Sequence, residues 1–430
     1  MCRSVYQYVI HGSTRLLTMK HTSKMITGSY SNALAGKKIA LCVTGSVAAV
    51  TTTSLARLLM RHGADVYCVM TDASREIVHP YLLEWATGNE VVAHLTGQIE
   101  HVTLAGKHPD KVDLVIISPS TANTIGKVAN GIDDTPVTTT VSSAIGASIP
   151  TLIIPAMHQS MYDHPAVVEN IGTLRKMGIR VLSPRIEEGK AKIPTTRTIL
   201  EHAIQLATPN DIGDRKFVIT AGPTRAWIDS VRFLTNPSTG KMGIALAEEV
   251  CSRGAEVDLI IGPTDEPTPS LANVVSVETP EEMLDEVMES LSSEDTDVFI
   301  SAAAVLDYQP KHKTEGKLKS EKKQREVKLV ATPKIIEEVR KAHSNLFIVG
   351  FKVEVGLEEE KLEESAREKI KAGTCNLMVA NDAAKKGVAF GTDTNQVMLV
   401  GENGFTQKTP KKSKRDIARI IIDEVIKRLE

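Results

Sequence analysis

Twice along this chain, a short run of β-branched and apolar residues is followed by a small-residue turn and then an amphipathic stretch. The first cycle starts at KIALCVT (38–44) and the second at KFVITAGPT (216–224). After each start, apolar runs alternate with helical patterns, as in βαβ units whose parallel sheet lies between helices. The sequence therefore predicts two doubly wound parallel-sheet α/β domains of Rossmann-like type.

The predicted elements divide the 430 residues between these two domains. A chain of this length exceeds one ordinary core, and the Pro, Asn, Asp and Gly cluster near 206–215 has the composition of a linker. The predicted division is an extension without order over 1–35, a first domain over 36–205, this linker, and a second domain over 216–430. The predicted strands are 38–44, 64–71, 112–118, 151–156, 216–224, 255–263, 296–304, 345–351 and 376–381, with helices over 46–63 and 241–254.

Composition limits the classes of binding partner and the cellular compartment that we expect for this protein. A net charge of -2 gives no reason to expect nucleic acid or an anionic membrane as partner. The five cysteines are odd in number and widely spaced, which predicts neither a disulfide framework nor a zinc site, and Cys42 and Cys68 lie in apolar runs typical of a core. No apolar run is long enough to span a bilayer, and no signal-peptide pattern opens the chain. We expect a cytoplasmic protein that acts on small molecules.

Polar residues follow two strands of the first domain. In TGSVAA (44–49), Gly45 allows a ligand to approach the backbone, and Ser46 opens a helix whose free N–H groups can hold a phosphate. An ordinary turn with a serine cap explains that segment equally well. The segment SPSTANTIGKVANG (118–131), however, holds more hydroxyls and amides than helix capping needs. The surplus indicates a polar ligand at this edge of the sheet.

Four motifs of the first domain resemble a known family. TGSVAAV, IEHVTLA, ISPSTANTIGKVANGIDDTPVTT and IPAMHQSMYDHP occur in the order seen in the phosphopantothenoylcysteine decarboxylase half of bifunctional enzymes of coenzyme A biosynthesis. The resemblance covers nearly all of 36–205 and implies an FMN cofactor. By that resemblance, FMN contacts Gly45, Ser46, Thr71, Ser118, Thr121, Ala122 and Asn123.

The resemblance also implies the catalytic residue and the chemistry. It places the family's catalytic histidine on His101. A cysteine carboxylate cannot leave as carbon dioxide without an electron sink, so FMN first oxidises the thiol to a thioaldehyde. Decarboxylation gives an enethiolate, which the reduced flavin returns to a thiol, while an imidazole handles protons or steers the carboxylate.

Two departures from the family pattern concern the substrate. Where relatives commonly carry PAMN, this chain has PAMH (155–158), so His158, beside Met157, replaces the amide expected to hold the substrate carboxylate. The later flap, IEEGKAKI (186–193), lacks the cysteine that protonates the enethiolate in many relatives. Lys190 or Lys192 can take its place as acid or as anion clamp. An alternative follows: an active ligase fused to a flavin-binding domain that is regulatory and not catalytic.

The start of the second domain combines features that suit an anion. ITAGPTRAWIDSVRFLTNPSTGKMG (219–243) holds a Gly-Pro turn, two arginines and an STGK element, without the spacing of a P-loop. Small residues, free N–H groups and Lys241 meet there at the positive end of a helix. The lysine-rich stretch 310–328 reads on composition alone as a solvated loop.

This half resembles the phosphopantothenate-cysteine ligase half of the same bifunctional enzymes. TAGPTR, VRFLTNPSTGKMG, AAAVLDY, GKLKS and VAND match in order over about 216–430. The resemblance implies a carboxylate activated as an acyl nucleotide, with Asn236 at the acyl group, Arg232 at the pantothenate side and Lys317 on a mobile loop. Asp307 would contact the nucleotide or its Mg²⁺. Further substrate contacts are Lys241, Phe351, Asn381 and Asp382.

The function predicted from both halves is two consecutive steps of coenzyme A biosynthesis. The fused architecture favours CTP over ATP as the nucleotide, and relatives imply trimers of the first domain and dimers of the second, extending to a dodecamer. A dehydrogenase with two dinucleotide folds predicts G-x-G-x-x-G after a first strand. Neither TGSVAAV nor TAGPTRA has that spacing, which excludes this class.

Overall fold

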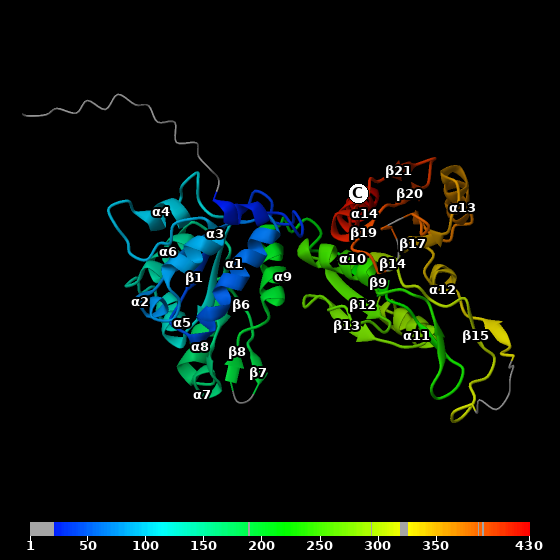
Figure 1. The fold of residues 1–430 in the computed structure, drawn as a ribbon, viewed down its shortest axis with the longest axis horizontal. Helices are drawn as coiled ribbons and strands as arrows, with labels where there is room; N and C mark the ends of the chain where they lie inside the picture. Colours follow the sequence, from blue (N-terminus) through cyan, green and yellow to red (C-terminus); the bar gives the residue numbers. More distant parts are fainter. Residues whose placement is uncertain (1–20, 188–189, 294, 319–325, 386, 389–390) are drawn as a thin grey trace, which may run out of the picture.

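The computed structural model describes residues 21–187, 190–293, 295–318, 326–385, 387–388 and 391–430. Over these ranges the chain forms two α/β domains, each built on its own sheet and lying side by side in Figure 1. Helix α9 (Thr196–Ala207) ends the first domain, and strand β9 (Lys216–Ala221) begins the second. The predicted fold class, two doubly wound parallel-sheet domains, is confirmed.

The first sheet has five parallel strands in the order β2–β1–β3–β4–β6. The chain runs outward from β1 in one direction and then from β3 in the other, so the loops after these two strands diverge and leave a crevice at their carboxyl ends. The central strands are buried on both faces, which explains their unbroken apolar sequences. The bounds are β1 Lys38–Val43, β2 Asp65–Met70, β3 Leu114–Ser120, β4 Thr151–Pro155 and β6 Arg180–Val181.

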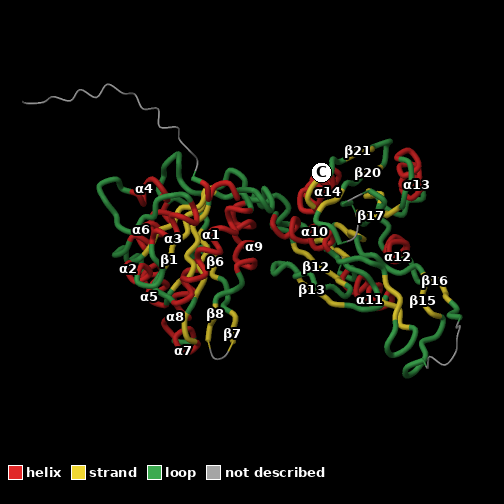
Figure 2. Tube along the Cα trace, in the orientation of Figure 1, coloured by secondary structure: helices red, strands yellow, loops and turns green. Residues whose placement is uncertain are grey.

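Helices cover both faces of this sheet (Figures 1 and 2). One core is closed by α1 (Thr52–Arg61), α3 (Pro80–Thr87) and α9, and the other by α5 (Ala122–Ala129), α6 (Pro136–Gly146) and α8 (Pro165–Lys176). The short elements are η2 Val47–Thr51, α2 Asp72–Arg75, α4 Glu100–Ala105 and α7 Gln159–Tyr162, with a small antiparallel sheet of β5 Met157–His158, β8 Lys190–Lys192 and β7 Arg185–Glu187.

The segment before β1 corrects one prediction. Residues 21–35 are not an extension without order, because helix η1 (Thr22–Ile26) packs beside α1 and α3. Leu34 is fully buried in the core of the first domain. The Lys24 amine donates to an Asp65 carboxylate oxygen at 3.0 Å. The segment carries no helical periodicity, so the sequence pattern gave no signal of this packing. Residues 1–20 lie outside the described part.

The second sheet has eight strands in the order β13–β12–β9–β14–β17–β18–β20–β21. The first six strands are parallel. The direction in which the chain adds strands to the sheet reverses between β9 and β14, as in dinucleotide-binding folds. The last two are antiparallel, which the sequence prediction missed; a tight turn with Asn403 and Gly404 at positive φ joins them. The bounds are β12 Glu256–Ile261, β13 Asn273–Ser276, β14 Val298–Ser301, β17 Phe347–Glu354, β18 Leu377–Asp382, β20 Met398–Gly401 and β21 Thr406–Lys408.

Five helices cover the described part of this second sheet. Helices α10 (Lys241–Ser252) and α14 (Lys414–Leu429) close one core, and α11 (Pro280–Ser290), α12 (Ile335–Ala342) and α13 (Glu359–Lys371) close the other. No helix among the described residues is long and apolar enough to cross a membrane. Short paired strands complete the domain: β10 Arg225–Trp227 with β11 Phe233–Thr235, β15 Tyr308–Pro310 with β16 Leu329–Ala331, and β19 Thr394–Asn395 with β22 Lys412–Ser413.

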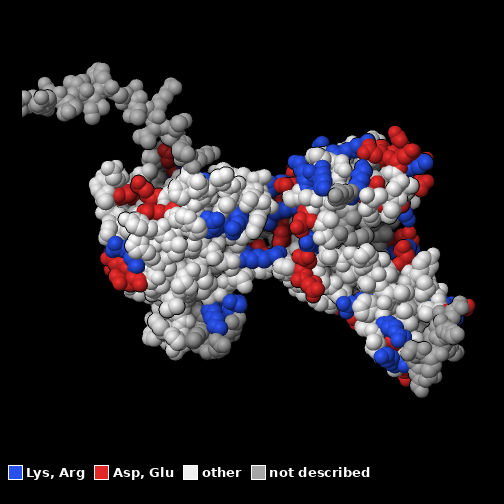
Figure 3. All heavy atoms as spheres, viewed as in Figure 1, with Lys and Arg blue, Asp and Glu red and all other residues white. Residues whose placement is uncertain are grey.

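Ion pairs join the two domains where α9 meets α10. Arg197 on α9 lies 2.5 Å from Glu248 on α10, and Arg415 on α14 lies 3.4 Å from the other oxygen of Glu248. Glu201 on α9 accepts hydrogen bonds from both the N–H, at 2.7 Å, and the hydroxyl of Ser270. Figure 3 shows acidic and basic side chains gathered between the two domains. Charged and polar side chains therefore connect α9 to the second domain.

Helix α10 can lie close to β9 only because Gly243 faces that strand. A Cβ at Gly243 would stand 2.5 Å from the Ala221 Cβ. We expect Gly243→Ala to lower the free energy of unfolding by about 1–3 kcal/mol, since helix and strand must separate. The control is Gly172→Ala in α8, where a Cβ meets nothing within 4 Å; it should raise stability by up to about 1 kcal/mol. Urea unfolding followed by circular dichroism measures both, and equal effects would contradict the packing described.

Candidate functional site

The crevice of the first sheet lies where the turns after β1 and β3 diverge. The Thr44 hydroxyl donates to the Pro119 carbonyl at 2.8 Å and accepts from the Thr121 N–H at 3.2 Å, which ties the two turns together. A Cβ at Gly45 would stand 2.5 Å from the Ala73 Cβ. Only glycine therefore allows the β1 turn to approach α2 this closely. Ser46 caps η2, its hydroxyl accepting from the Ala48 N–H.

Two cavities flank this turn. The first, here the inner cavity, contains four residues predicted to bind the cofactor: Gly45, Thr71, Thr121 and Asn123. Thr71 and Thr121 cap α2 and α5 through their hydroxyls, so the positive ends of two helices face the cavity. Its full lining is Thr44, Gly45, Thr71, Asp72, Ala73, Thr121, Asn123, Thr124, Lys127, Asp134, Thr135, Pro136 and Thr138.

The second, here the flap cavity, lies between the η2 turn and the β5–β8–β7 sheet. It contains Ser46 and the predicted substrate residues Met157 and His158. Arg185 and Lys192 pair across β7 and β8 and also line it, so three basic side chains surround the cavity. Figure 3 shows basic atoms where this sheet lies. Lys190 belongs to β8, but its side chain lies outside the described part. The remaining lining is Val47, Ala48, Thr51, Ala156, Ile193, Pro194, Thr195 and Thr196.

Three predicted residues lie in neither cavity. Ser118 is buried within β3, and Ala122 begins α5 behind its cap. His101 lies on the short helix α4, whose contacts are with α6, and it lines neither cavity of its own chain. The Nδ1 atom of His101 is buried without a hydrogen-bond partner among the described residues. The predicted catalytic histidine is therefore absent from the lining of both cavities, which hold Gly45, Ser46, Thr71, Thr121 and Asn123.

The inner cavity has the features that a phosphate-bearing flavin needs. Helix N-termini at Thr71 and Thr121 supply N–H groups, and a glycine turn leaves room for close approach. The Ser120 hydroxyl is fully buried beside this edge and has no hydrogen-bond partner in the described chain. A buried polar group without a partner indicates a ligand that completes it. The residues present therefore fit a flavin phosphate.

No described cysteine takes the place of the flap cysteine. Cys42 and Cys68 lie in β1 and β2 and are fully buried, as predicted. Burial raises the pKa of the Cys68 thiol to about 12, and it also raises the pKa of Cys42. Cys251 and Cys375 are buried in the second domain. Among the described residues, an acid that replaces the flap cysteine must therefore be another residue type.

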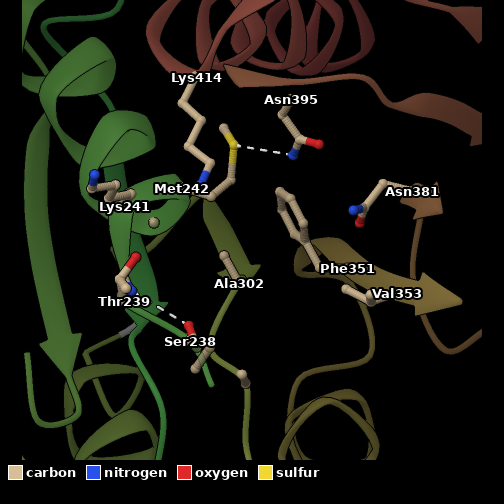
Figure 4. A pocket seen from close by; sticks show the side chains of 14 residues that line it. Ser238, Thr239, Lys241, Met242, Ala302, Phe351, Val353, Asn381, Asn395 and Lys414 are labelled. Carbon is tan, nitrogen blue, oxygen red and sulfur yellow. Dashed lines mark hydrogen bonds between the residues drawn. The ribbon is translucent and has the colours of Figure 1, made fainter. Parts of the chain in front are cut away.

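The second sheet has its own cavity, here the ligase-side cavity, at the carboxyl edge between β9 and β14. Its walls are the first turn of α10, the residues after β14, and parts of β17, β18 and α14 (Figure 4). Predicted residues Lys241, Phe351 and Asn381 line it. The other lining residues are Ser238, Thr239, Gly240, Met242, Gly243, Ala302, Ala303, Ala304, Val353, Asn395 and Lys414.

Lys414 is a residue of this cavity that sequence reasoning missed. It is only 8% exposed, and burial, followed by the nearby Lys241, lowers its pKa to about 8. Asp393 and Glu266 oppose that shift. Ser413 caps α14 by accepting from the Asp416 N–H, so a serine before a helical pattern was the available signal.

Asn236 contacts the loop after β14, and Asp307 lies at the end of that loop. The Asn236 amide donates to the carbonyls of Ala304 and Val305 at 3.0 and 3.2 Å, which places it next to the cavity wall. Asp307 is exposed and pairs with Lys334. Among the described residues, no group of three or more His, Cys, Asp or Glu could hold a metal. A metal ion held by Asp307 would therefore need its other ligands from a bound nucleotide.

Buried Asp229 organises the loop that carries Lys317. Its carboxylate accepts from the N–H groups of Val231 and Arg232, each at 2.7 Å, and of Leu318 at 3.1 Å. Burial alone would raise the pKa of Asp229, but these N–H groups and the Arg232 guanidinium, at 3.2 Å, hold it below its usual value. Lys317 is exposed at the end of this anchored segment. The sequence pattern gave no reason to select Asp229.

The VAND motif divides between two roles. Asn381 lines the ligase-side cavity, whereas Asp382 turns away from it. The Asp382 carboxylate accepts from the N–H groups of Gly356 and Ala384, at 2.8 and 2.9 Å, and these bonds lower its pKa. The structure therefore places Asn381 at the cavity and Asp382 in the loops beside the sheet, and the contact of both residues with a nucleotide stays a prediction.

The fold and the cavities define a two-domain α/β protein, with a flavodoxin-like sheet followed by a Rossmann-like sheet and a ligand cavity at the switch point of each. Two family models match the chain. "Flavoprotein" covers residues 27–208, and "DNA/pantothenate metabolism flavoprotein C-terminal domain" covers residues 212–429.

The relatives agree over the whole length. The coenzyme A biosynthesis bifunctional protein CoaBC of Thermococcus kodakarensis is 47% identical over 96% of this chain and 100% of its own. CoaBC of Methanocaldococcus jannaschii is 37% identical over 95% of this chain and 98% of its own. A crystal structure of a CoaBC C-terminal domain is 33% identical, covering 51% of this chain and 98% of that chain with a TM-score of 0.43. The chain belongs to the CoaBC family of bifunctional coenzyme A biosynthesis enzymes, which confirms the predicted resemblance.

The anchoring role of Asp229 is testable apart from the chemistry. We expect Asp229→Asn to lower ligase kcat/KM by about tenfold or more, because the loop bearing Lys317 loses the carboxylate oxygen that accepts from its Leu318 N–H and ties it to the β10–β11 connection. Conversion of supplied phosphopantothenoylcysteine should not change. Because the pKa of Asp229 is depressed, the contacts should be intact at neutral pH and lost only as pH falls through that pKa.

The control for this prediction is Asp295→Asn, which removes an exposed carboxylate that pairs with Lys216 at 3.5 Å. Its ligase activity should match that of the unchanged protein. Equal activity of the Asp229 and Asp295 variants in a coupled pyrophosphate assay would contradict the anchoring role.

Proposed function

We propose that the ligase-side cavity joins 4'-phosphopantothenate to cysteine at the expense of CTP, and that the first domain then decarboxylates the product with FMN to 4'-phosphopantetheine. The observation that carries this proposal is the presence, in one chain, of separate sites at the switch points of two sheets: the inner and flap cavities at the first sheet and the ligase-side cavity at the second. Two such sites suit two chemically unlike steps, because neither site contains residues of the other.

The ligation step needs cations at the phosphates and a polar group at the acyl carbon. The substrate carboxylate attacks the α-phosphorus of CTP, pyrophosphate leaves, and the cysteine amine then displaces CMP. Lys241 and the first turn of α10 would hold the phosphates at the positive helix end. Asn236, fixed against two carbonyls, would orient the acyl group, and Lys317 would close on the leaving pyrophosphate.

Three further assignments belong to this step. Arg232, beside Asp229, would bind the pantothenate side of the substrate. Phe351 and Asn381 would contact the nucleotide from the opposite wall of the cavity. Asp307 would take part in binding Mg²⁺, with the nucleotide phosphates supplying the other oxygens.

The decarboxylation step belongs to the inner and flap cavities. FMN, held by Gly45, Ser46, Thr71, Thr121 and Asn123, would supply the oxidation of the thiol and its later reduction. His158, Arg185 and Lys192 surround the flap cavity and would bind the anionic groups of the substrate. Lys192, on the flap, is the described residue best placed to donate the proton that a flap cysteine gives elsewhere.

The position of His101 supports a homo-oligomer. It lines neither cavity of its own chain, and its Nδ1 atom is buried without a partner in the described part. Ile99 and Val102, on and beside α4, are exposed apolar side chains. We therefore propose that His101 serves the flavin site of a neighbouring copy, in a trimer of first domains, with second domains pairing into a larger assembly in the cytoplasm.

The direct test follows the products by mass after adding 4'-phosphopantothenate, cysteine, Mg²⁺ and CTP or ATP. We expect 4'-phosphopantetheine from the unchanged protein, with CTP preferred. His101→Asn should stop at phosphopantothenoylcysteine, and Lys317→Gln should stop before it. If the unchanged protein itself stops at phosphopantothenoylcysteine with FMN bound, the first domain is the regulatory flavin-binding module of the alternative function.

Mixed oligomers test whether His101 acts on a neighbouring site. His101→Asn and Gly45→Val, which blocks the β1 turn against Ala73, should each abolish decarboxylation alone. Mixed in equal amounts after dissociation and reassembly, they should regain up to about a quarter of the activity, since about a quarter of the sites then combine an intact turn with an intact histidine. A mixture as inactive as its parts would show that His101 and the turn must belong to one chain.

A further inference from the structure

Two lysines begin two helices that converge on the ligase-side cavity. Lys241 is the first residue of α10, a helix of 12 residues, and Lys414 is the first residue of α14, a helix of 16 residues. Both lysines line the cavity (Figure 4). Two positive helix ends and two ammonium groups therefore act on the same small volume.

The two lysines are not equivalent. Lys241 is satisfied by carboxylates, lying 2.6 Å from Asp393 and 3.5 Å from Glu266. Lys414 is 8% exposed, and its backbone N–H donates to the Asp393 carbonyl at 3.0 Å. Charged side chains of the described part that act on the Lys414 amine include Lys241 from α10, Asp393 from the loop before β19, and Glu266 from the loop after β12.

We propose that Lys414 is a phosphate-binding residue of the ligase-side cavity and that its amine takes up a proton when the nucleotide binds. The proposal rests on the proposed function, because the anion is the triphosphate of the ligase nucleotide. It identifies a second cation for the site, in addition to Lys241, and it makes nucleotide binding depend on pH.

The direction of the pH dependence follows from the surroundings of the amine. Without an anion, burial and Lys241 hold the pKa of Lys414 at about 8. A triphosphate near the amine favours its charged form and raises that pKa. Proton uptake is therefore greatest at pH values between the pKa of Lys414 in the free protein and its higher pKa in the nucleotide complex. Affinity should fall as pH rises through about 8, by up to about tenfold per pH unit.

Calorimetry of the full-length protein with Mg²⁺ and CTP measures both the nucleotide affinity and the proton uptake. Titrations at pH 8.5 in two buffers of different ionisation enthalpy should give an uptake of about 0.7 proton, and those at pH 7.0 about 0.1, from a free pKa near 8. Lys414→Met should lose the uptake and bind at least about tenfold more weakly at pH 7.0. Lys414→Arg should bind without uptake, because arginine stays charged.

The matched control is Lys412→Met, which removes an exposed lysine two residues earlier on β22 and should change neither affinity nor uptake. If Lys414→Met keeps the uptake and binds within twofold of the unchanged protein, the role of Lys414 is contradicted while the ligase function stands. If the unchanged protein binds neither CTP nor ATP, the proposed ligase function itself is contradicted. A far-UV circular-dichroism spectrum of Lys414→Met equal to that of the unchanged protein shows that a loss of binding is not unfolding.

Discussion

The convergence of helix N-termini on the carboxyl edge of a parallel sheet determines where this protein can bind its ligands. Parallel strands deliver every following turn to the same edge, and the reversal of winding opens a crevice there. Thr71 and Thr121 cap the helices at the first crevice, and α10 and α14 begin at the second. Both sites therefore combine N–H groups and a positive helix end, which suits the phosphate groups of a flavin and of a nucleotide.

A chain of polar contacts connects the two crevices. Thr195 and Thr196 line the flap cavity, and the next residue, Arg197, bonds to Glu248 and to the Pro267 carbonyl, at 2.5 and 3.1 Å. Glu248 also pairs with Arg415, which follows Lys414 of the ligase-side cavity. Helix α9 therefore begins at the flap cavity, and its ion pair with Glu248 leads to Arg415, the neighbour of Lys414 in the ligase-side cavity. Fusion into one chain keeps these partners together.

The sequence predicted what depends on local pattern. Alternating apolar runs gave both sheets, and glycine, hydroxyl and amide residues after strands gave Gly45, Thr121 and Asn123 of the inner cavity, whereas Thr71 came from the resemblance. It missed what depends on packing between distant segments: the order of residues 21–35, the antiparallel β20 and β21, the anchor Asp229 and the buried Lys414. Neither pattern nor resemblance separated Asn381, which faces its cavity, from Asp382, which caps nearby loops. His101 shows another limit, because it lines neither the inner cavity nor the flap cavity of its own chain.

If the two sites are independent, each domain performs its own step from its own cavity. The most direct measurement supplies phosphopantothenoylcysteine to the FMN-loaded protein without any nucleotide and follows released carbon dioxide and product mass. The account predicts 4'-phosphopantetheine at the full rate, and no product of either step from 4'-phosphopantothenate and cysteine under the same conditions. Absence of decarboxylation of the supplied intermediate, or a requirement for CTP in that step, would contradict two independent sites.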